Sequence, residues 1–293
     1  MAESLDGKIV IAVSSRALFN FEEENMVFKT EGEKAYKQFQ LSRIDTPAEP
    51  GAAFPLVKKL LSFNSREKAN VEVLIISHND PISGLRVFKS AQANGLNITR
   101  GVFSGGEPAY KYINPLGASL YLTTSPGSVQ QALKNGHPAA LIYANSKASK
   151  YADQTQLRVA FDGDGVLFGT ESQKIYDLHG IEKFETLETR KANKPLSEGP
   201  LKPFLKALHY LQTIAPENVR TALVTARNAP SHERAIKTLM KWDIEVHEAF
   251  FLGGLSKAEF LKEFDPDIFF DDHDLNCDKA SEFVPTAKVD HGV

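Results

Sequence analysis

Two carboxylates spaced by single glycines follow directly after an apolar run. The run Val159–Phe161 continues as Asp162, Gly163, Asp164 and Gly165. Side chains alternate along an extended chain, so both carboxylates can point the same way, and the glycines permit a tight turn. Like charges held this close favour a divalent cation between them. The ordinary alternative for such a sequence is the turn of a β-hairpin.

Further polar groups follow other apolar runs in the second half of the chain. Thr225 ends one run, Lys257 opens a helix-forming segment, and Asp271 and Asp272 come after Ile268–Phe270. Each has an ordinary explanation by itself, as a helix cap, a solvated lysine or a turn. Their occurrence together, each beside a strand end, favours one shared site.

These groups need a sheet to bring them together, and the chain alternates as such a sheet requires. Helix-forming segments such as Phe54–Phe63 separate the apolar runs. The strand-like runs of the first half are Lys8–Val13, Val71–Ile76, Val102–Phe103 and Leu120–Leu122. This order predicts an α/β fold with a Rossmann-like parallel sheet and helices on both faces. Ligands bind such sheets at the carboxyl ends of the strands.

The two halves of the chain repeat this plan at a constant offset of 148 residues, the separation of Ser14 from Asp162. Strand ends coincide at this offset, and Gly32, Arg86 and Lys89 meet identical residues. We interpret the repeat as an ancient duplication, with coincidental α/β regularity as the alternative. The predicted domains are residues 1–150, a non-catalytic α/β lobe, and residues 151–293, a catalytic domain with a small cap at about 169–198.

The groups capable of chemistry belong to the second half only. At the offset, Ser14 stands opposite Asp162, Arg16 opposite Asp164, Ala109 opposite Lys257, and Thr123 and Thr124 opposite Asp271 and Asp272. The first half would then be a degenerate lobe that supports or closes the active site. Its Ser14, Ser15 and Arg16 suit either a surface turn or contact with an anion such as phosphate.

Composition describes an ordinary globular protein. The chain has 293 residues, 42% of them hydrophobic, and a formal net charge of −3. It lacks the basic excess expected of a nucleic-acid or anionic-membrane partner. A single Cys277, the absence of a recognisable signal peptide and the absence of long apolar runs predict a cytoplasmic location. The sequence permits a homo-oligomer and does not reveal the number of subunits.

The same motifs resemble those of a known superfamily. Asp162-Gly163-Asp164-Gly165-Val166, Thr225, Lys257 and Asp271-Asp272 resemble the four motifs of the haloacid dehalogenase phosphotransferases. The longer strings IAVSSRALF, RVAFDGDGVLF, NKPLSEGPLK, LVTARN and IFFDD are similar to the cytosolic 5′-nucleotidase type I, AMP-preferring family. The similarity runs over nearly the whole chain. It implies a haloacid dehalogenase type of fold and Mg²⁺-dependent hydrolysis of nucleoside 5′-monophosphates.

The resemblance also implies residue roles. Asp162 would be the nucleophile and Asp164 the general acid and base. Mg²⁺ would be held by Asp162, the Asp164 carbonyl and the Asp271-Asp272 pair, with Asp272 the favoured direct ligand. Thr225, with the N–H groups of Ala226 and Arg227, would bind the phosphoryl group, and Lys257 would offset its charge.

Substrate selection is less defined in the sequence. Arg190, Asn193 and Lys194 of the predicted cap are candidate substrate contacts or solvated loop residues, as Ser14 and Ser15 are in the first lobe. Phe19, Phe21 and Phe168 could stack a base or belong to the core. The alternative functions are another small-molecule phosphatase, a nucleoside phosphotransferase, and a non-catalytic nucleotide sensor. The preferred base, the sugar and any effector are open.

Overall fold

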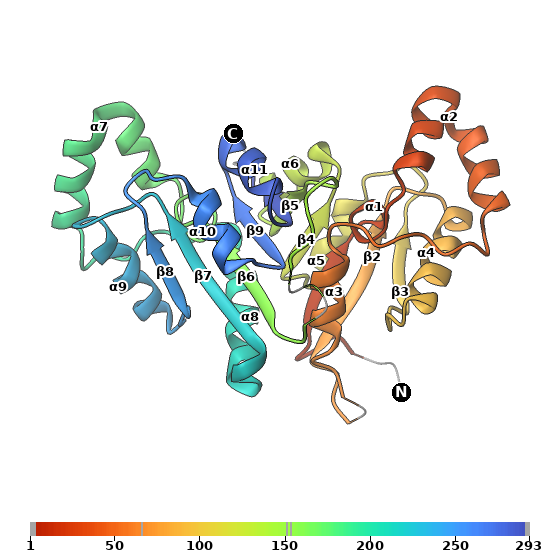
Figure 1. Ribbon diagram of the computed structural model, residues 1–293, viewed down its shortest axis with the longest axis horizontal. Coiled ribbons are helices and arrows are strands. Elements are labelled where there is room, and N and C mark those ends of the chain that lie inside the picture. Colours follow the sequence, from red (N-terminus) through yellow and green to blue (C-terminus); the bar gives the residue numbers. More distant parts are fainter. Residues whose placement is uncertain (1–3, 66, 151, 153, 291–293) are drawn as a thin grey trace. The chain divides into compact units, whose positions relative to one another are not determined.

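A computed structural model of the protein describes residues 4–65, 67–150, 152 and 154–290 (Figure 1). Residues up to 145 form one compact unit, and residues 146–290 belong to a second. Both units alternate strands with helices, and the strands pair in parallel. The protein is therefore a mixed α/β protein with parallel sheets, as predicted.

In the N-terminal unit the parallel strands run in the order β3-β2-β1-β4-β5. The strands are β1 (Ile9–Val13), β2 (Val71–Ser77), β3 (Arg100–Phe103), β4 (Leu120–Thr123) and β5 (Ala139–Ile142). The helices are α1 (Ser15–Leu18), α2 (Glu22–Ser42), α3 (Phe54–Leu61), α4 (Pro81–Ala93), α5 (Ile113–Leu116) and α6 (Pro126–Lys134), with a 3₁₀ turn at Ala109–Tyr112. Every residue of β1 is buried, as expected of a central parallel strand covered on both faces.

In the C-terminal unit the order is β10-β9-β6-β7-β8. The strands are β6 (Leu157–Phe161), β7 (Val219–Thr225), β8 (Glu248–Phe251), β9 (Ile268–Asp271) and β10 (Thr286–Lys288). The helices are α7 (Glu171–Arg190), α8 (Lys202–Ile214), α9 (His232–Trp242), α10 (Lys257–Phe264) and α11 (Asp274–Ser281), with a 3₁₀ turn at Pro216–Asn218. In this unit the first strand, β6, lies between β7 and β9, as β1 lies between β2 and β4 in the N-terminal unit.

One long helix in each unit bends at a glycine. Gly32 in α2 has φ 85° and ψ −177°, and Gly180 in α7 has φ 75° and ψ −178°. Glycine adopts positive φ without the strain that a Cβ would cause. The sequence predicts a helix only to about His179, but the polar stretch beyond continues the helix to Arg190. Figure 1 shows α7 beyond the carboxyl ends of β7 and β8.

The offset of 148 residues also relates hydrogen bonds in the two units. Ser14 N donates to Leu122 O, as Asp162 N does to Phe270 O, and Ser104 N donates to Ser77 O, as Leu252 N does to Thr225 O. Arg86 Nε donates to Thr46 O, as Arg234 Nε does to Lys194 O. A duplicated fold would produce this relation, and the duplication stays a hypothesis.

Among the described residues, the helices are too short or too polar to cross a membrane.

Candidate active site

The strand order of the C-terminal unit assembles the predicted groups at one edge of its sheet. Phe161, the last residue of β6, pairs with Leu223 of β7 and with Phe270 of β9. Asp162 follows this central strand, while Thr225 ends β7 and Asp271 ends β9. Parallel strands end on the same side, so three segments distant in sequence deliver their polar residues together.

Lys257 joins two of these carboxylates. Its ammonium nitrogen lies 2.8 Å from Asp162 Oδ1 and 2.7 Å from Asp271 Oδ2, and all three residues are buried. Burial alone would lower the pKa of Lys257, but the two carboxylates outweigh it and raise that pKa above its usual value. Burial raises the pKa of Asp162 well above its usual value, and Lys257 opposes this shift. The carboxylates of Asp271 and Asp272 add to it.

Asp162, Asp271 and Asp272 have the composition of a divalent-metal site. One carboxylate oxygen from each lies within 4.8 Å of the other two. The three carboxylates and the ammonium of Lys257 together carry a formal charge of −2 when all are ionised, which a divalent cation would neutralise. Hard oxygen ligands suit Mg²⁺. Both oxygens of Asp271 already accept hydrogen bonds, from Lys257, from His273 N and from Asn276 Nδ2.

Asp164 lies beside this cluster in a different environment. Arg227 donates to both of its oxygens, from Nε to Oδ2 and from Nη2 to Oδ1, each at 2.7 Å. Such a bidentate pair fixes the orientation of the carboxylate. The resemblance implies that the backbone N–H of Arg227 helps to bind the phosphoryl group, and this stays a prediction. The side chain of Arg227 contacts Asp164 and Glu188, and its backbone N–H donates to Thr225 Oγ1 at 3.3 Å.

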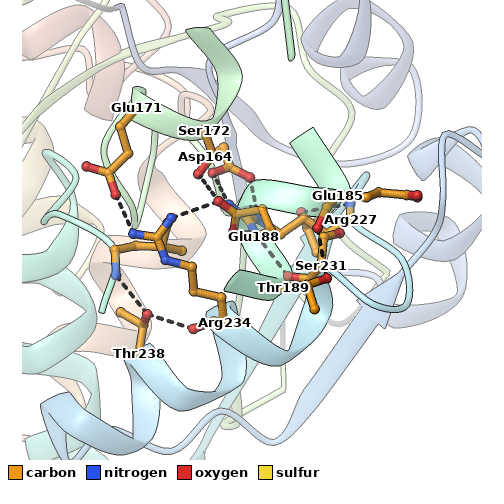
Figure 2. Close-up of polar contacts among 12 residues, drawn as sticks. Asp164, Glu171, Ser172, Glu185, Glu188, Thr189, Arg227, Ser231, Arg234 and Thr238 are labelled. Atoms are coloured by element: carbon orange, nitrogen blue, oxygen red, sulfur yellow. Dashed lines mark hydrogen bonds and ion pairs between the residues drawn. The ribbon is translucent and has the colours of Figure 1, made fainter. Parts of the chain in front are cut away.

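A buried ion-pair network extends from Asp164 to α7 (Figure 2). Glu188 of α7 accepts from Arg227 at 2.5 Å and from Arg234 at 2.7 Å, and Arg234 also pairs with Glu171 at 2.9 Å. Burial alone would raise the pKa of Glu188, but Arg227 and Arg234 hold it below its usual value. Glu188 was not among the residues predicted from the sequence. One signal pointed to its surroundings: positions 86 and 234, which correspond at the repeat offset, are both arginine.

Thr225 approaches the Asp162 loop closely. It is 1% exposed, and a Cβ built at Gly163 would lie 3.2 Å from its hydroxyl oxygen. Only a residue without a side chain leaves this space open, while Gly165, at φ 84°, provides the turn predicted after Asp164. Ala226, the next residue after Thr225, is exposed.

The described hydrogen bonds of the other predicted contact residues do not involve the carboxylate cluster. Asn193 and Lys194 are exposed after α7, where Asn193 accepts from Lys237 and the Lys194 carbonyl accepts from Arg234. In the N-terminal unit, Ser14 follows β1 and caps α1, which begins at Ser15, and both serines line a cavity.

Aromatic residues occur both in the core and, partly exposed, on α7. Phe19 and Phe168 are fully buried, and Phe168 packs on Trp242, so they belong to the core. On α7, Tyr176 is 46% exposed and meets Phe184 edge to face, with ring centroids 6.0 Å apart. The irregular polar pattern of this helix concealed the pair.

Comparisons with known proteins agree on one family. A sequence model of the 5′-nucleotidase family, described as "5'-nucleotidase", matches residues 1–293. Human "Cytosolic 5'-nucleotidase 1B" is 37% identical over 289 residues, which cover 93% of this chain. The chain spans 47% of the length of that relative. Among solved structures, a chain titled "Structure of Pnkp1/Rnl/Hen1 complex" aligns over the full length of both chains with a TM-score of 0.33 and 12% identity, a likeness too weak to use.

Proposed function

Because the chain belongs to the 5′-nucleotidase family, we propose that it hydrolyses AMP-like nucleoside 5′-monophosphates to a nucleoside and phosphate, with Mg²⁺ as cofactor. The observation that carries this proposal is the cluster of Asp162, Asp271 and Asp272 at one sheet edge, in which Asp162 and Asp271 also pair with Lys257. The name of the human relative and the single cysteine support a cytosolic location.

The proposed reaction has two displacements. A carboxylate oxygen of Asp162 attacks phosphorus, so that the O–P bond to Asp162 forms as the P–O5′ bond breaks. Asp164 gives a proton to the departing 5′ oxygen. Asp164 then takes a proton from water, whose oxygen attacks phosphorus and releases Asp162 and inorganic phosphate. The covalent route divides one difficult displacement into two easier ones.

Neighbouring groups prepare Asp162 for this attack. Lys257 restrains its carboxylate and would offset charge on the phosphoryl oxygens, and the hydroxyl of Thr225, which lies close to Gly163, would donate to them. Asp162 and Asp272, with the Asp164 carbonyl, would hold Mg²⁺, while Asp271 orients Lys257. When bound, Mg²⁺ supplies charge neutralisation and clamps the phosphoryl group.

The bidentate pair adds a condition to this mechanism. Both oxygens of Asp164 accept from Arg227, and a protonated carboxyl is a weaker acceptor than a carboxylate. We therefore expect the contact with Arg227 to weaken when Asp164 carries the proton that it gives to the leaving group. The network through Glu188 makes α7, the helix of the cap, the element that we expect to respond to substrate.

Phosphate release from AMP, IMP, CMP, deoxynucleotides and sugar phosphates, with and without Mg²⁺ and an acceptor nucleoside, tests the proposal. We expect Mg²⁺-dependent release, fastest from nucleotides. Asp162→Asn should lower kcat by at least about a thousandfold, because it removes the nucleophile. The exposed Asp278 of α11 provides the matched control, Asp278→Asn. Undiminished release by Asp162→Asn would defeat the covalent route, and a preference for sugar phosphates would defeat the nucleotidase assignment.

A further inference from the structure

The N-terminal unit contains a cavity of about 450 Å³ at the carboxyl ends of its own strands. Ser77 and Thr123, the last residues of β2 and β4, line it together with Ser15, the first residue of the helix α1 that follows β1. Small-molecule sites are typically clefts of about 300–1,000 Å³ that combine apolar walls with a few placed polar groups. The cavity has this size and composition, and it occupies the position that the candidate active site has in the C-terminal unit.

One of the polar groups lining this cavity lacks a partner. Ser15 is 1% exposed, and its hydroxyl oxygen makes no hydrogen bond to any residue that the structure describes. A buried hydroxyl without a partner costs about 1–3 kcal/mol, so folded proteins seldom leave one unsatisfied. A polar ligand in the cavity would supply the missing bond.

An aromatic pair forms part of the cavity wall. Phe28 of α2 is 50% exposed and meets Tyr36 edge to face, with ring centroids 5.8 Å apart. At the repeat offset, Tyr176 and Phe184 make the same contact on α7. An exposed ring beside buried hydroxyls suits a ligand with one flat apolar part and one polar part.

The charges of the candidate active site are missing here. Ser14 and Thr123 replace Asp162 and Asp271, and Ala109 replaces Lys257. The charged groups that do line the cavity have partners: Arg16 pairs with Glu22 at 2.7 Å, Glu33 pairs with Lys37, and Asp80 accepts hydrogen bonds from the start of α4. His78, which also lines the cavity, lies 2.8 Å from the Ser128 hydroxyl. A phosphate dianion would find neither a metal-binding carboxylate cluster nor an ammonium at these positions. An uncharged ligand fits the site better.

We infer that the N-terminal unit binds a nucleoside, with its base on Phe28 and its sugar hydroxyls towards Ser15, Ser77 and Thr123. The choice of a nucleoside rests on the proposed function, since the same scaffold would take a nucleotide in the catalytic unit. The site would thus bind the class of product that the proposed reaction releases.

Calorimetric titration of the whole protein with adenosine, inosine, cytidine and uridine, in metal-free buffer, tests this inference. Because hydrolysis is not measured, failure of the proposed reaction would not remove the binding signal. Phe28→Ala should weaken nucleoside binding by about tenfold or more through lost stacking. The matched variant Tyr176→Ala should retain a nucleoside site. Binding abolished by Tyr176→Ala and unchanged by Phe28→Ala, or no binding of any of the four nucleosides, would overturn the inference.

Two further measurements examine the ligand and the hydroxyl. AMP binding more tightly than adenosine at the site that Phe28→Ala weakens would overturn the uncharged assignment. Ser15→Ala removes the unpaired hydroxyl, so the ligand-free melting temperature should be unchanged or higher, while the upward shift caused by adenosine should shrink. A lower ligand-free melting temperature, or an undiminished shift, would show that Ser15 does not await a ligand.

Discussion

Lys257 is the residue on which the charge balance of the candidate active site depends. Its ammonium lies between Asp162 and Asp271, with little contact with water. Removing one partner from a buried ion pair is far more damaging than losing an exposed pair, because the remaining charges are left uncompensated. The residue should therefore matter for both folding and rate.

Lys257→Gln should lower kcat by about a hundredfold or more, since one electrostatic contact to the phosphoryl group is lost. In metal-free buffer it should also lower the free energy of unfolding by about 3–5 kcal/mol, measured by chemical denaturation. Mg²⁺ should recover part of this loss, because it replaces the missing positive charge. Lys262→Gln, a partly exposed lysine of the same helix, is the control. Equal effects of the two substitutions would contradict the role of Lys257.

The helix α7 is linked to Asp164, the proposed acid, through Glu188 and Arg227. This buried carboxylate contacts both Arg227, which binds Asp164, and Arg234, which binds the chain after α7. The helix of the predicted cap is thereby linked to the proposed acid. Its contacts are ionic, so they can be tested by removing charge without changing shape.

Glu188→Gln should lower the free energy of unfolding by about 3 kcal/mol at neutral pH, because two buried guanidinium groups lose a shared anion. It should also lower kcat, since Arg227 is left with Asp164 as its one anionic partner among the described ion pairs. Glu233→Gln, which alters an exposed pair on α9, should leave stability unchanged. A Glu188→Gln protein as stable as the wild type would contradict the network.

The effect of Glu188→Gln should depend on pH in a defined direction. The pKa of Glu188 is below its ordinary value of 4.5 in the folded protein. The carboxylate therefore contributes stability that is present above about pH 4.5 and is lost as pH falls through the lowered folded pKa. Denaturation curves of wild type and Glu188→Gln should converge in acid. A difference that widens below pH 4 would reverse the sign of this prediction.

The two units of the protein share a strand order but differ in the charged residues at their strand ends. We predict that Mg²⁺ slows amide hydrogen exchange at residues 162–165 and 271–273, the two segments that carry Asp162, Asp271 and Asp272. The corresponding residues 14–16 and 123–125 should be unaffected, because hydroxyls replace the carboxylates there. Protection by Mg²⁺ at residues 14–16 as well would argue against a division of roles between the units.

Much of this arrangement could be predicted from sequence because it depends on local order. Apolar runs predicted the central strands, and their polar ends predicted Asp162, Thr225 and Asp271 at one edge. The strands β5, β8 and β10 were missed. Each has only three or four residues, and an apolar run that short cannot be told from a buried loop by its sequence. The full length of α7 was missed because its polar surface carries little periodicity. The pair between Asp164 and Arg227 depends on side-chain geometry that spacing does not encode.

The bidentate ion pair between Arg227 and Asp164 bears on which acceptor receives the phosphoryl group. In the proposed mechanism, the ester on Asp162 survives until Asp164, which Arg227 holds in place, takes a proton from water. A longer-lived ester gives another alcohol time to enter and accept the phosphoryl group in place of water. The strength of the ion pair between Arg227 and Asp164 would then influence how turnover is divided between hydrolysis and transfer to a second nucleoside.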